Sequence, residues 1–466
     1  MKLTITRSHS QNLARQLAEL GVPLDLRCGG NGTCGKCRVR LLAGKWKVDD
    51  RDVEIPCEAL ACRTILISDV GEVKVPESSL EQSSGNILAE WVNVQIPVTH
   101  QTVIAIDIGT TTIVAVKIKD GQVVGRASCY NAQSQLGDNI ITRIQHASEG
   151  MLETLNQLVM RSVDGLLAQL GLDGVDRIAI AGNTVMNCLF HQINPESIGS
   201  VPFTPPMRVF PTKKEMFGGI PVLTVPSIAG YIGGDLTAGM AVIDLQSDEM
   251  LVDIGTNCEI IYATEAGIFC AAAAAGPAFE GAGLSCGTRA IKGAIDHYFK
   301  NGTFSTIGKL PPIGICGSGF IDFLAVQHSN GHLNQFGRYE PKAKSFRIVD
   351  DIMVYEYDIE QLLKAKAAVW AGIMTLENHC GRAARKIYLA GGFAQYLDLK
   401  NAISIGMLPE REYEIVGNTS LAGAARLACE PDLLNELITL IDIPQEVQLN
   451  TLSDFEDNYI DGLLLP

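Results

Sequence analysis

The chain has 466 residues, of which 47% are hydrophobic and 19% are charged, and this is enough to bury the cores of two or three globular domains. Its formal net charge of −15 and its pI of about 5.0 argue against a nucleic-acid or anionic-membrane partner. The first residues lack the apolar core of a signal peptide, and no apolar run approaches the length of a membrane span. We therefore expect a cytoplasmic protein.

The N-terminal segment is rich in cysteine. Five of the 13 cysteines fall in the first 62 residues, and "CGGNGTCGKC" (28–37) spaces three of them as C-x5-C-x2-C. In a reducing compartment such a cluster is more typical of a metal site than of disulfides. Its glycines allow the loop to fold closely around a cluster whose sulfides accept backbone hydrogen bonds. The partial match to a phosphate loop ends at Cys37, where Ser or Thr is required.

The sequence around these cysteines predicts a small β domain over residues 1–76. "KLTIT", "CRVRLL" and "ILISDVGEVKVP" are typical of strands, the last with a turn at residues 69–71, and "SQNLARQLAEL" predicts a helix that ends at Gly21. The domain resembles a shortened plant- or adrenodoxin-type ferredoxin of the β-grasp class. The Ser-rich start of residues 77–100 predicts a linker to the next domain.

A ferredoxin-like domain implies a [2Fe–2S] cluster bound by four thiolates, and structural zinc is the alternative metal. Cys57 and Cys62 compete for the fourth position. We favour Cys62, because "LAC" is expected to open a strand as it does in such ferredoxins. The predicted metal ligands are Cys28, Cys34, Cys37 and Cys62.

Two later segments share one pattern. "IAIDIGTTTIVAVKI" (104–118) and "MLVDIGTNCEIIYAT" (250–264) each place Asp-Ile-Gly-Thr between two apolar strands. In such a turn Gly allows close approach to a phosphate, Thr and backbone N–H groups donate to it, and Asp can hold hydrated Mg²⁺. The predicted phosphate-binding residues are Gly109, Thr110, Thr111 and Thr112 in the first loop and Gly255, Thr256 and Asn257 in the second, with Asp107 and Asp253 beside them.

This repeat resembles the two phosphate loops of the actin-like superfamily of sugar kinases and chaperone ATPases. The resemblance implies a duplicated α/β ATPase domain of ribonuclease H-like fold over residues 101–466, with lobes at about 101–248 and 249–430 and a C-terminal extension at 431–466. "KIYLAGGFAQYLDLKNAISIGMLP" (386–409) resembles the adenosine motif, in which Gly391 and Gly392 receive the nucleoside; a plain strand–helix turn is the alternative.

Four further segments are candidates for the same nucleotide site. "GYIGGDLTAGMAVIDL" places Asp235 at a helix start, where the superfamily carries the acid that polarises the attacking hydroxyl or water; a helix N-cap is the alternative role. Gly317 and Ser318 open a helix suited to an anion or a ribose. "AIAGNTVMNCLF" offers Asn183 and Thr184 as water or substrate contacts, or as a polar turn, and residues 271–287 are expected to form a close-packed, mobile loop nearby.

A ferredoxin-like domain joined to an actin-like ATPase, together with "AAGPAFEGA", "GICGSG" and "LAGGFA", resembles the reductive activators of corrinoid-dependent proteins. The resemblance implies ATP-dependent transfer of one electron from the cluster to an inactive Co(II) corrinoid, which restores Co(I). It implies ATP and Mg²⁺ as cofactors. The implied partner is the corrinoid protein of a methyltransferase system, with an unidentified upstream electron donor and a homodimer as the assembly.

The chain departs from that family in three respects, of which one is that its ferredoxin-like segment is expected to lack a first hairpin. Only about 25 residues separate the two predicted domains, where family members carry a linker domain and a middle domain, so the chain is expected to be a shortened member. Cys258 stands in the second phosphate loop where the family commonly has Gly, and its thiol either crowds the phosphates or faces the core. The rival functions are an ATP-gated donor to another low-potential metalloenzyme, a small-molecule kinase, and a redox-sensing ATP-binding module.

Overall fold

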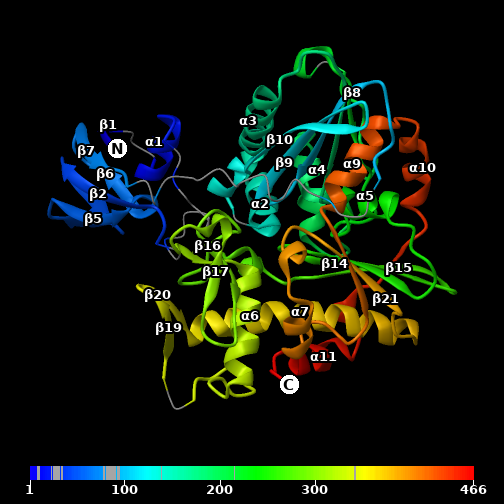
Figure 1. Ribbon diagram of the computed structural model, residues 1–466. Coiled ribbons are helices and arrows are strands. Elements are labelled where there is room, and N and C mark those ends of the chain that lie inside the picture. The colour runs from blue at the N-terminus through cyan, green and yellow to red at the C-terminus, as the bar shows by residue number, and fades with distance from the viewer. Residues whose placement is uncertain are drawn as a thin grey trace. The chain divides into compact units, whose positions relative to one another are not determined.

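The computed structural model describes residues 1–7, 11–22, 24, 32, 35–76, 79, 91, 95–137, 139–214, 216–340 and 343–466. The chain divides into two compact units, one of residues 1–83 with 132–143 and the other of 84–131 with 144–466 (Figure 1). The predicted ligands Cys28 and Cys34 and most of the predicted linker lie outside the described residues. No helix in the described part of the chain is long and apolar enough to cross a membrane.

The first unit is a small β structure with one helix. A four-stranded sheet has the order β1-β7-β2-β5, and a three-stranded sheet has the order β4-β3-β6. Helix α1 packs against the short turn η1 and against β6. The elements are β1 (Lys2–Thr6), α1 (Leu13–Glu19), β2 (Arg38–Ala43), β3 (Trp46–Val48), β4 (Arg51–Val53), β5 (Cys57–Leu60), η1 (Ala61–Arg63), β6 (Thr64–Leu66) and β7 (Val70–Lys74).

Alternation along the strands builds the core of this unit. In β2 the side chains of Val39 and Leu41 are buried while those of Arg38 and Arg40 are exposed, as expected for a strand with one covered face. The apolar face of α1 adds Leu13 and Leu17 to the same core. The strand and helix predictions are confirmed, but the turn expected at 69–71 lies one to two residues earlier, because Val70 and Gly71 already pair in β7.

The second unit contains two sheets with the same internal arrangement. In the first lobe the order is β10-β9-β8-β11-β12, where β8, β9 and β10 are antiparallel neighbours and β11 and β12 continue in parallel. The elements are β8 (Thr102–Ile108), β9 (Thr112–Lys119), β10 (Gln122–Tyr130), α3 (Leu152–Leu170), β11 (Val175–Gly182), α4 (Thr184–Phe190), β12 (Val222–Thr224) and α5 (Gly234–Val242). Helix α2 (Ile140–His146) follows β10 in sequence.

The second lobe repeats this order as β22-β21-β13-β14-β15-β23. Again three antiparallel strands, β13 to β15, are extended by two parallel ones, β21 and β22. Its main elements are β13 (Glu249–Ile254), β14 (Cys258–Thr264), β15 (Gly267–Ala273), η8 (Pro277–Glu280), α6 (Gly317–Ser329), α7 (Glu356–Cys380), β21 (Lys386–Ala390), α8 (Leu399–Ser404) and β22 (Glu412–Gly417). Two small sheets contain β16 (Ala294–Tyr298), β17 (Phe304–Thr306) and β18 (Gly314–Ile315), and β19 (Ser345–Val349) and β20 (Ile352–Tyr355).

Helices cover the faces of these sheets (Figure 1). In the first lobe α3 packs against β9 and β10, and α9 (Thr419–Cys429) packs against β8 and β11 and beside α5. In the second lobe α7 packs against β14 and β15, and α11 (Phe455–Gly462) packs against α7. The last residues also include α10 (Leu433–Leu440) and β23 (Gln445–Glu446). The predicted C-terminal extension is therefore shared between the lobes: α10 packs into the core of the first-lobe sheet, and β23 pairs with β15 of the second.

Candidate functional site

Two of the four predicted metal ligands are described, and they lie together. The sulfur atoms of Cys37 and Cys62 are 3.3 Å apart, and both side chains are buried in the core of the first unit. Two sulfur ligands that each lie about 2.3 Å from one tetrahedral metal ion are separated by about 3.8 Å. The pair therefore fits two ligands of a single metal centre.

Hydrogen bonds position both of these cysteines. The N–H of Ala61 donates to the carbonyl oxygen of Cys37 at 2.9 Å, and the side-chain amide of Asn12 donates to the carbonyl oxygen of Cys62 at 3.1 Å. Asn12 also caps α1, because its Oδ1 accepts from the N–H of Arg15 at 3.0 Å. One side chain thus links the start of the helix to the turn that carries Cys62.

The structure corrects the reason for preferring Cys62. "LAC" does not open a strand: Cys62 lies in the 3-10 turn η1, between β5 and β6, where the chain reverses over α1. Cys57 is half-buried on β5, where it pairs with Leu41 of β2. Cys62, rather than Cys57, is the thiol in contact with Cys37.

The described glycines of the cysteine loop have backbone angles that favour Gly. Gly32 has φ +74° and Gly35 has φ +65°, in the left-handed region. A Cβ on Gly32 would lie 2.5 Å from Nε of Arg63, which follows Cys62. Gly32 therefore lies against the side chain of the residue that follows Cys62.

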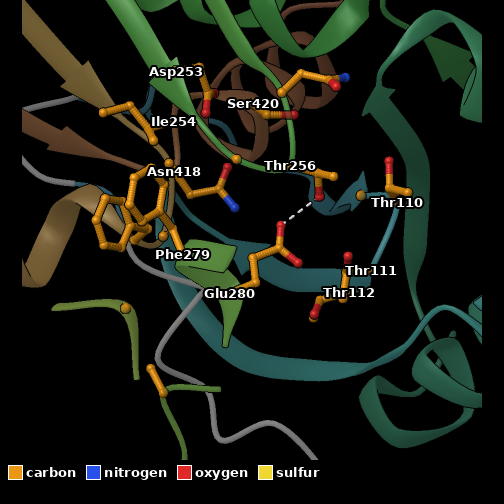
Figure 2. A pocket seen from close by; sticks show the side chains of 18 of the residues that line it. Thr110, Thr111, Thr112, Asp253, Ile254, Thr256, Phe279, Glu280, Asn418 and Ser420 are labelled. Carbon is orange, nitrogen blue, oxygen red and sulfur yellow. Dashed lines mark hydrogen bonds between the residues drawn. The ribbon is translucent and has the colours of Figure 1, made fainter. Parts of the chain in front are cut away.

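The second unit contains a cavity of about 220 Å³ between the two repeated sheets, which we call the central cavity. The following predicted nucleotide-site residues line it, from both lobes: Asp107, Gly109, Thr110, Thr111, Thr112, Asp235, Asp253, Gly255, Thr256, Asn257, Gly317, Ser318, Gly391 and Gly392. Figure 2 shows the three threonines of the first loop gathered on one side and Phe279 on the other. The segments meet here because each follows the end of a central strand or opens a helix.

The first phosphate-loop candidate is held by contacts from the start of α9, distant in the chain, and from the residue that follows β11. The carboxylate of Asp107 accepts from Nδ2 of Asn418 at 2.9 Å and from Oγ of Ser420 at 2.8 Å, at the start of α9. The side chain of Asn183 donates to Oγ1 of Thr110 at 3.0 Å. Asn183 is the N-cap of α4 and lines the central cavity, whereas Thr184 is buried and donates to the carbonyl oxygen of Ala229.

The second candidate loop leaves the cavity open to a ligand. Gly255 donates to the carbonyl oxygen of Asn257 at 2.8 Å, which closes the turn between β13 and β14. Cys258 is fully buried in the hydrophobic core and is absent from the cavity lining, so its thiol faces the core and does not crowd the loop. Burial also raises the pKa of the Cys258 thiol, which keeps it protonated.

Gly391 has no room for a side chain. It has φ +96°, and a Cβ there would lie 2.6 Å from the carbonyl oxygen of Ile254 and 2.9 Å from Oδ1 of Asp253. Gly317 is similarly confined, since its Cβ would lie 2.1 Å from the carbonyl oxygen of Phe279. These glycines bring β21 and the start of α6 against the cavity.

Asp235 is not the helix N-cap. Gly233 holds that position, and Asp235 lies in the first turn of α5, with its Oδ1 accepting from the N–H of Leu236 at 2.8 Å. The carboxyl group lines the cavity together with Asp107 and Asp253. Asp235 thus shares the cavity with both candidate phosphate loops.

The acidic side chains of the cavity shift one another's ionisation. Burial, reinforced by the charge of Asp107, raises the pKa of Asp235 to about 7. Burial and the charges of Asp235 and Asp107 raise the pKa of Asp253 to about 8. The pKa of Asp107 is raised by burial and lowered in part by its two hydrogen bonds. Burial and mutual repulsion thus disfavour full ionisation of the three carboxyl groups.

Several lining residues were not predicted from the sequence. They are Glu259, Phe279, Glu280, Arg289, Phe393, Tyr396, Asn418 and Ser420. The rings of Phe279 and Phe393 stack with centroids 4.7 Å apart. Oγ1 of Thr256 donates to Oε1 of Glu280 at 2.8 Å, and this contact is the dashed line in Figure 2. The only sequence signal for two of these residues was the small-residue segment 271–287, which was expected near the nucleotide.

Sequence comparison identifies three family regions in order along the chain. Residues 2–66 match the 2Fe-2S iron-sulfur cluster binding domain, residues 102–248 match the RACo middle region, and residues 248–466 match the C-terminal domain of RACo, the ASKHA domain. The first match supports a [2Fe–2S] cluster and the last supports ATP binding. The expectation that the chain lacks a middle domain is wrong, because the region assigned to the first ATPase lobe is the family's middle region.

Individual relatives agree with these matches. The corrinoid activation enzyme RamQ of Eubacterium limosum is 26% identical over 560 aligned positions, which cover 95% of this chain and 94% of the relative. Since 560 exceeds the 466 residues of this chain, the relative carries segments that this chain lacks. The [Co(II) methylated amine-specific corrinoid protein] reductase of Methanosarcina barkeri is 28% identical over 65% of each chain.

A solved structure extends the similarity to the whole fold. It is titled as a reductive activator for corrinoid, iron-sulfur protein, and it matches with a TM-score of 0.73 and 25% identity over 99% of this chain and 98% of that one. The ferredoxin-like and actin-like fold assignments are confirmed. The chain belongs to the RACo family of reductive activators, in which an iron–sulfur domain precedes the RACo middle region and the ASKHA domain.

Proposed function

We propose that this protein is an ATP-dependent reductive activator that passes one electron from a [2Fe–2S] cluster in its first unit to the Co(II) corrinoid of a partner protein. This proposal rests mainly on the observation that one chain contains both the Cys37–Cys62 pair and the central cavity between two lobes. The relatives named as a corrinoid activation enzyme and as a Co(II) corrinoid protein reductase support the same acceptor. The cytoplasm is the proposed location and a homodimer the proposed assembly.

The cluster supplies one-electron chemistry when it is bound, with Cys37 and Cys62 as two of its ligands and Cys28 and Cys34 as the others. Burial of the described pair excludes water from the sulfurs, and η1 and Asn12 orient Cys62. In its reduced state a bound cluster would supply the single electron that converts the partner's Co(II) to Co(I). A plant-type cluster has a reduction potential of about −400 mV. For one electron, every ~59 mV by which the acceptor's potential lies below that of the cluster lowers the equilibrium constant tenfold. Reduction of an acceptor of lower potential therefore requires an additional source of free energy.

ATP and Mg²⁺ are the proposed ligands of the central cavity. Gly109 to Thr112 and Gly255 to Asn257 provide Thr hydroxyl groups and backbone N–H groups for the phosphates, and Gly391 and Gly392 receive the nucleoside. Among the described residues no three metal-binding side chains converge to enclose an ion. We therefore propose that Asp107 and Asp253 hold Mg²⁺ through water, with phosphate oxygens completing its shell.

Asp235 is the proposed group that polarises the attacking water. Its carboxyl group lines the central cavity beside Asp107 and Asp253, and an ionised carboxylate there can accept a proton from the attacking water. Mg²⁺ near Asp107 and Asp253 would lower the pKa of Asp235 and keep the carboxylate ionised. Hydrolysis, or binding alone, would then change the separation of the two lobes and reset the complex with the acceptor.

Anaerobic reconstitution with iron and sulfide tests the redox part of this proposal. We expect two irons per chain and a rhombic EPR signal after reduction with dithionite. The Cys62→Ser variant should lose this signal, while Cys57→Ser, the matched control, should keep it. One zinc and no iron in the purified protein would refute the electron-transfer function.

The acceptor is tested with a Co(II) corrinoid protein of a methyltransferase system. Appearance of the Co(I) absorbance should require the reduced protein, ATP and Mg²⁺ together. The Asp235→Asn variant should keep its EPR signal and ATP affinity but lose at least about tenfold in ATP hydrolysis. ATP-independent reduction at the full rate would show that the central cavity has no part in the reaction.

A further inference from the structure

The side chains that line the central cavity carry more acidic than basic groups, although the proposed ligand is itself a negatively charged triphosphate. Of the described residues that line it, five are acidic, Asp107, Asp235, Asp253, Glu259 and Glu280, and one, Arg289, is basic. A nucleotide adds further negative charge to this acidic surface. Mg²⁺ can offset part of that charge, and Arg289 is the side chain of the described lining that can offset more.

Glu280 and Arg289 come from one loop between β15 and β16, whose two ends are pressed together. A Cβ on Gly281 would lie 2.2 Å from the carbonyl oxygen of Thr288, and a Cβ on Gly287 would lie 2.2 Å from the carbonyl oxygen of Gly281. We call the close approach of Gly281 to Gly287 and Thr288 the neck of the loop. Glu280 immediately precedes the neck and Arg289 immediately follows it. This close backbone contact places Glu280 and Arg289 on the two sides of the narrow base of one loop.

Each of the two side chains reaches toward a different phosphate loop. Oε1 of Glu280 accepts from Oγ1 of Thr256 in the second loop at 2.8 Å (Figure 2), and Gly276, just before η8, donates to the carbonyl oxygen of Thr256 at 2.8 Å. The guanidinium of Arg289 lies over the ring of Tyr130, 3.8 Å from its centre. Tyr130 is the last residue of β10, in the other lobe.

The Tyr130 contact places Arg289 beside the support of the first loop. The next residue, Asn131, donates from Nδ2 to the carbonyl oxygen of Gly109 at 3.0 Å and from its N–H to the carbonyl oxygen of Thr111 at 3.0 Å. The neck thus lies between a carboxylate that contacts the second loop and a cation next to the first. Both side chains line the central cavity, where the proposed nucleotide would bind.

We propose that Glu280 and Arg289 act as a linked pair that senses the terminal phosphate, and this inference rests on ATP binding as proposed above. Arg289 binds the terminal phosphate of ATP, and the same phosphate repels the Glu280 carboxylate from the Thr256 hydroxyl, which then donates to the phosphate. With ADP there is no such phosphate, and the Thr256–Glu280 hydrogen bond persists. The 281–288 loop therefore takes a different position with each nucleotide.

The test is calorimetric titration of the full-length protein with the non-hydrolysable analogue AMPPNP and with ADP, both with Mg²⁺. The native protein should prefer AMPPNP. Arg289→Gln should weaken AMPPNP binding by about tenfold or more, the loss expected for one charge-assisted hydrogen bond, and should change ADP binding by less than about threefold. Glu280→Gln, which keeps the shape and removes the charge, should strengthen AMPPNP binding several-fold and leave ADP unchanged.

Two further variants serve as controls. Lys292→Gln removes an exposed cation three residues beyond Arg289 and should leave both affinities unchanged. Arg289→Lys keeps the positive charge and should retain part of the preference even where Arg289→Gln folds poorly. Equal losses for AMPPNP and ADP in Arg289→Gln, or an equal effect of Lys292→Gln, would overturn the inference. Failure of the native protein to bind either nucleotide would instead refute the proposed function itself.

Discussion

Replacement of Gly391 by Ala should lower both the stability of the protein and its affinity for ATP, because it adds backbone strain and a steric contact at the candidate nucleotide site. At φ +96° any residue with a Cβ is strained by about 1–2 kcal/mol. The new Cβ would also lie 2.6 Å from the carbonyl oxygen of Ile254, whereas ordinary contact begins at 3.4 Å. The β13 end and β21 must therefore separate by up to about 0.8 Å, and such overpacking typically costs about 1–3 kcal/mol.

The two terms together predict a loss of about 2–5 kcal/mol in the free energy of unfolding. At about 2 °C per kcal/mol for a domain of this size, the melting temperature should fall by about 4–10 °C. The displaced groups are the carbonyl oxygen of Ile254 and Oδ1 of Asp253, which adjoin the second phosphate loop. ATP affinity should consequently fall by about tenfold or more, the equivalent of about 1.4 kcal/mol.

Gly381→Ala is the matched control. Gly381 ends α7 with φ +66°, and a Cβ there meets nothing within 4 Å, so this variant carries the strain without the contact. It should lose only about 2–4 °C, since strain alone costs about 1–2 kcal/mol, and its ATP affinity should not change. The measurements are thermal unfolding by circular dichroism and calorimetric titration with ATP. Equal losses of stability in the two variants, with unchanged ATP affinity, would refute the steric argument.

Three other predictions concern ionisation and anchoring. Burial raises the pKa of Asp235 to about 7 and that of Asp253 to about 8, so the folded protein retains protons that the unfolded chain releases near 3.8. Without Mg²⁺ the melting temperature should therefore fall as the pH rises from about 6 to about 8.5. The Asp253→Asn variant should show a weaker dependence of melting temperature on pH. Asn12→Ala removes the cap of α1 and the hydrogen bond to Cys62, so unfolding should cost about 1 kcal/mol less and iron should be lost faster to a chelator, which an unchanged chelation rate would contradict. Lys366→Met removes the buried ammonium that donates to the carbonyl oxygens of residues 406, 462 and 464. The free energy of unfolding should fall by at least about 2 kcal/mol, and α11 should become accessible to limited proteolysis. A digestion pattern like that of the native protein would argue against this anchor.

Local sequence patterns were sufficient for the elements that surround both candidate sites. The two Asp-Ile-Gly-Thr turns stand between β8 and β9 and between β13 and β14, because apolar strands on either side leave the turn at the edge of a sheet. The positive φ angles of Gly32 and Gly35 agree with the expectation that the cysteine loop uses backbone conformations favoured by Gly. Errors arose where two local signals compete. "LAC" has the composition of a strand start, but the reversal between β5 and β6 makes it a 3-10 turn.

The role of Asp235 shows the same limit at a helix end. An acidic residue near the start of α5 is compatible with either a cap or a cavity-facing carboxylate. The backbone decided between them: a Cβ on Gly233 would lie 2.4 Å from Cα of Asn183, so the helix begins one residue before Asp235 and the carboxylate faces the cavity. That contact joins α5 to the end of β11, and no pattern within α5 encodes it.

Local sequence patterns identify the groups that are available for chemistry: cysteines on a glycine-rich loop, two Asp-Ile-Gly-Thr turns, and a pair of glycines after a buried strand. The tertiary structure alone decided which groups act on one another. Asp107 is held by Asn418 and Ser420, more than 300 residues away in the chain, and the neck of the 281–288 loop links Glu280 to Arg289. The physical reason is that periodicity and turn chemistry act over a few residues, whereas partners of this kind meet only when two lobes fold around a common cavity.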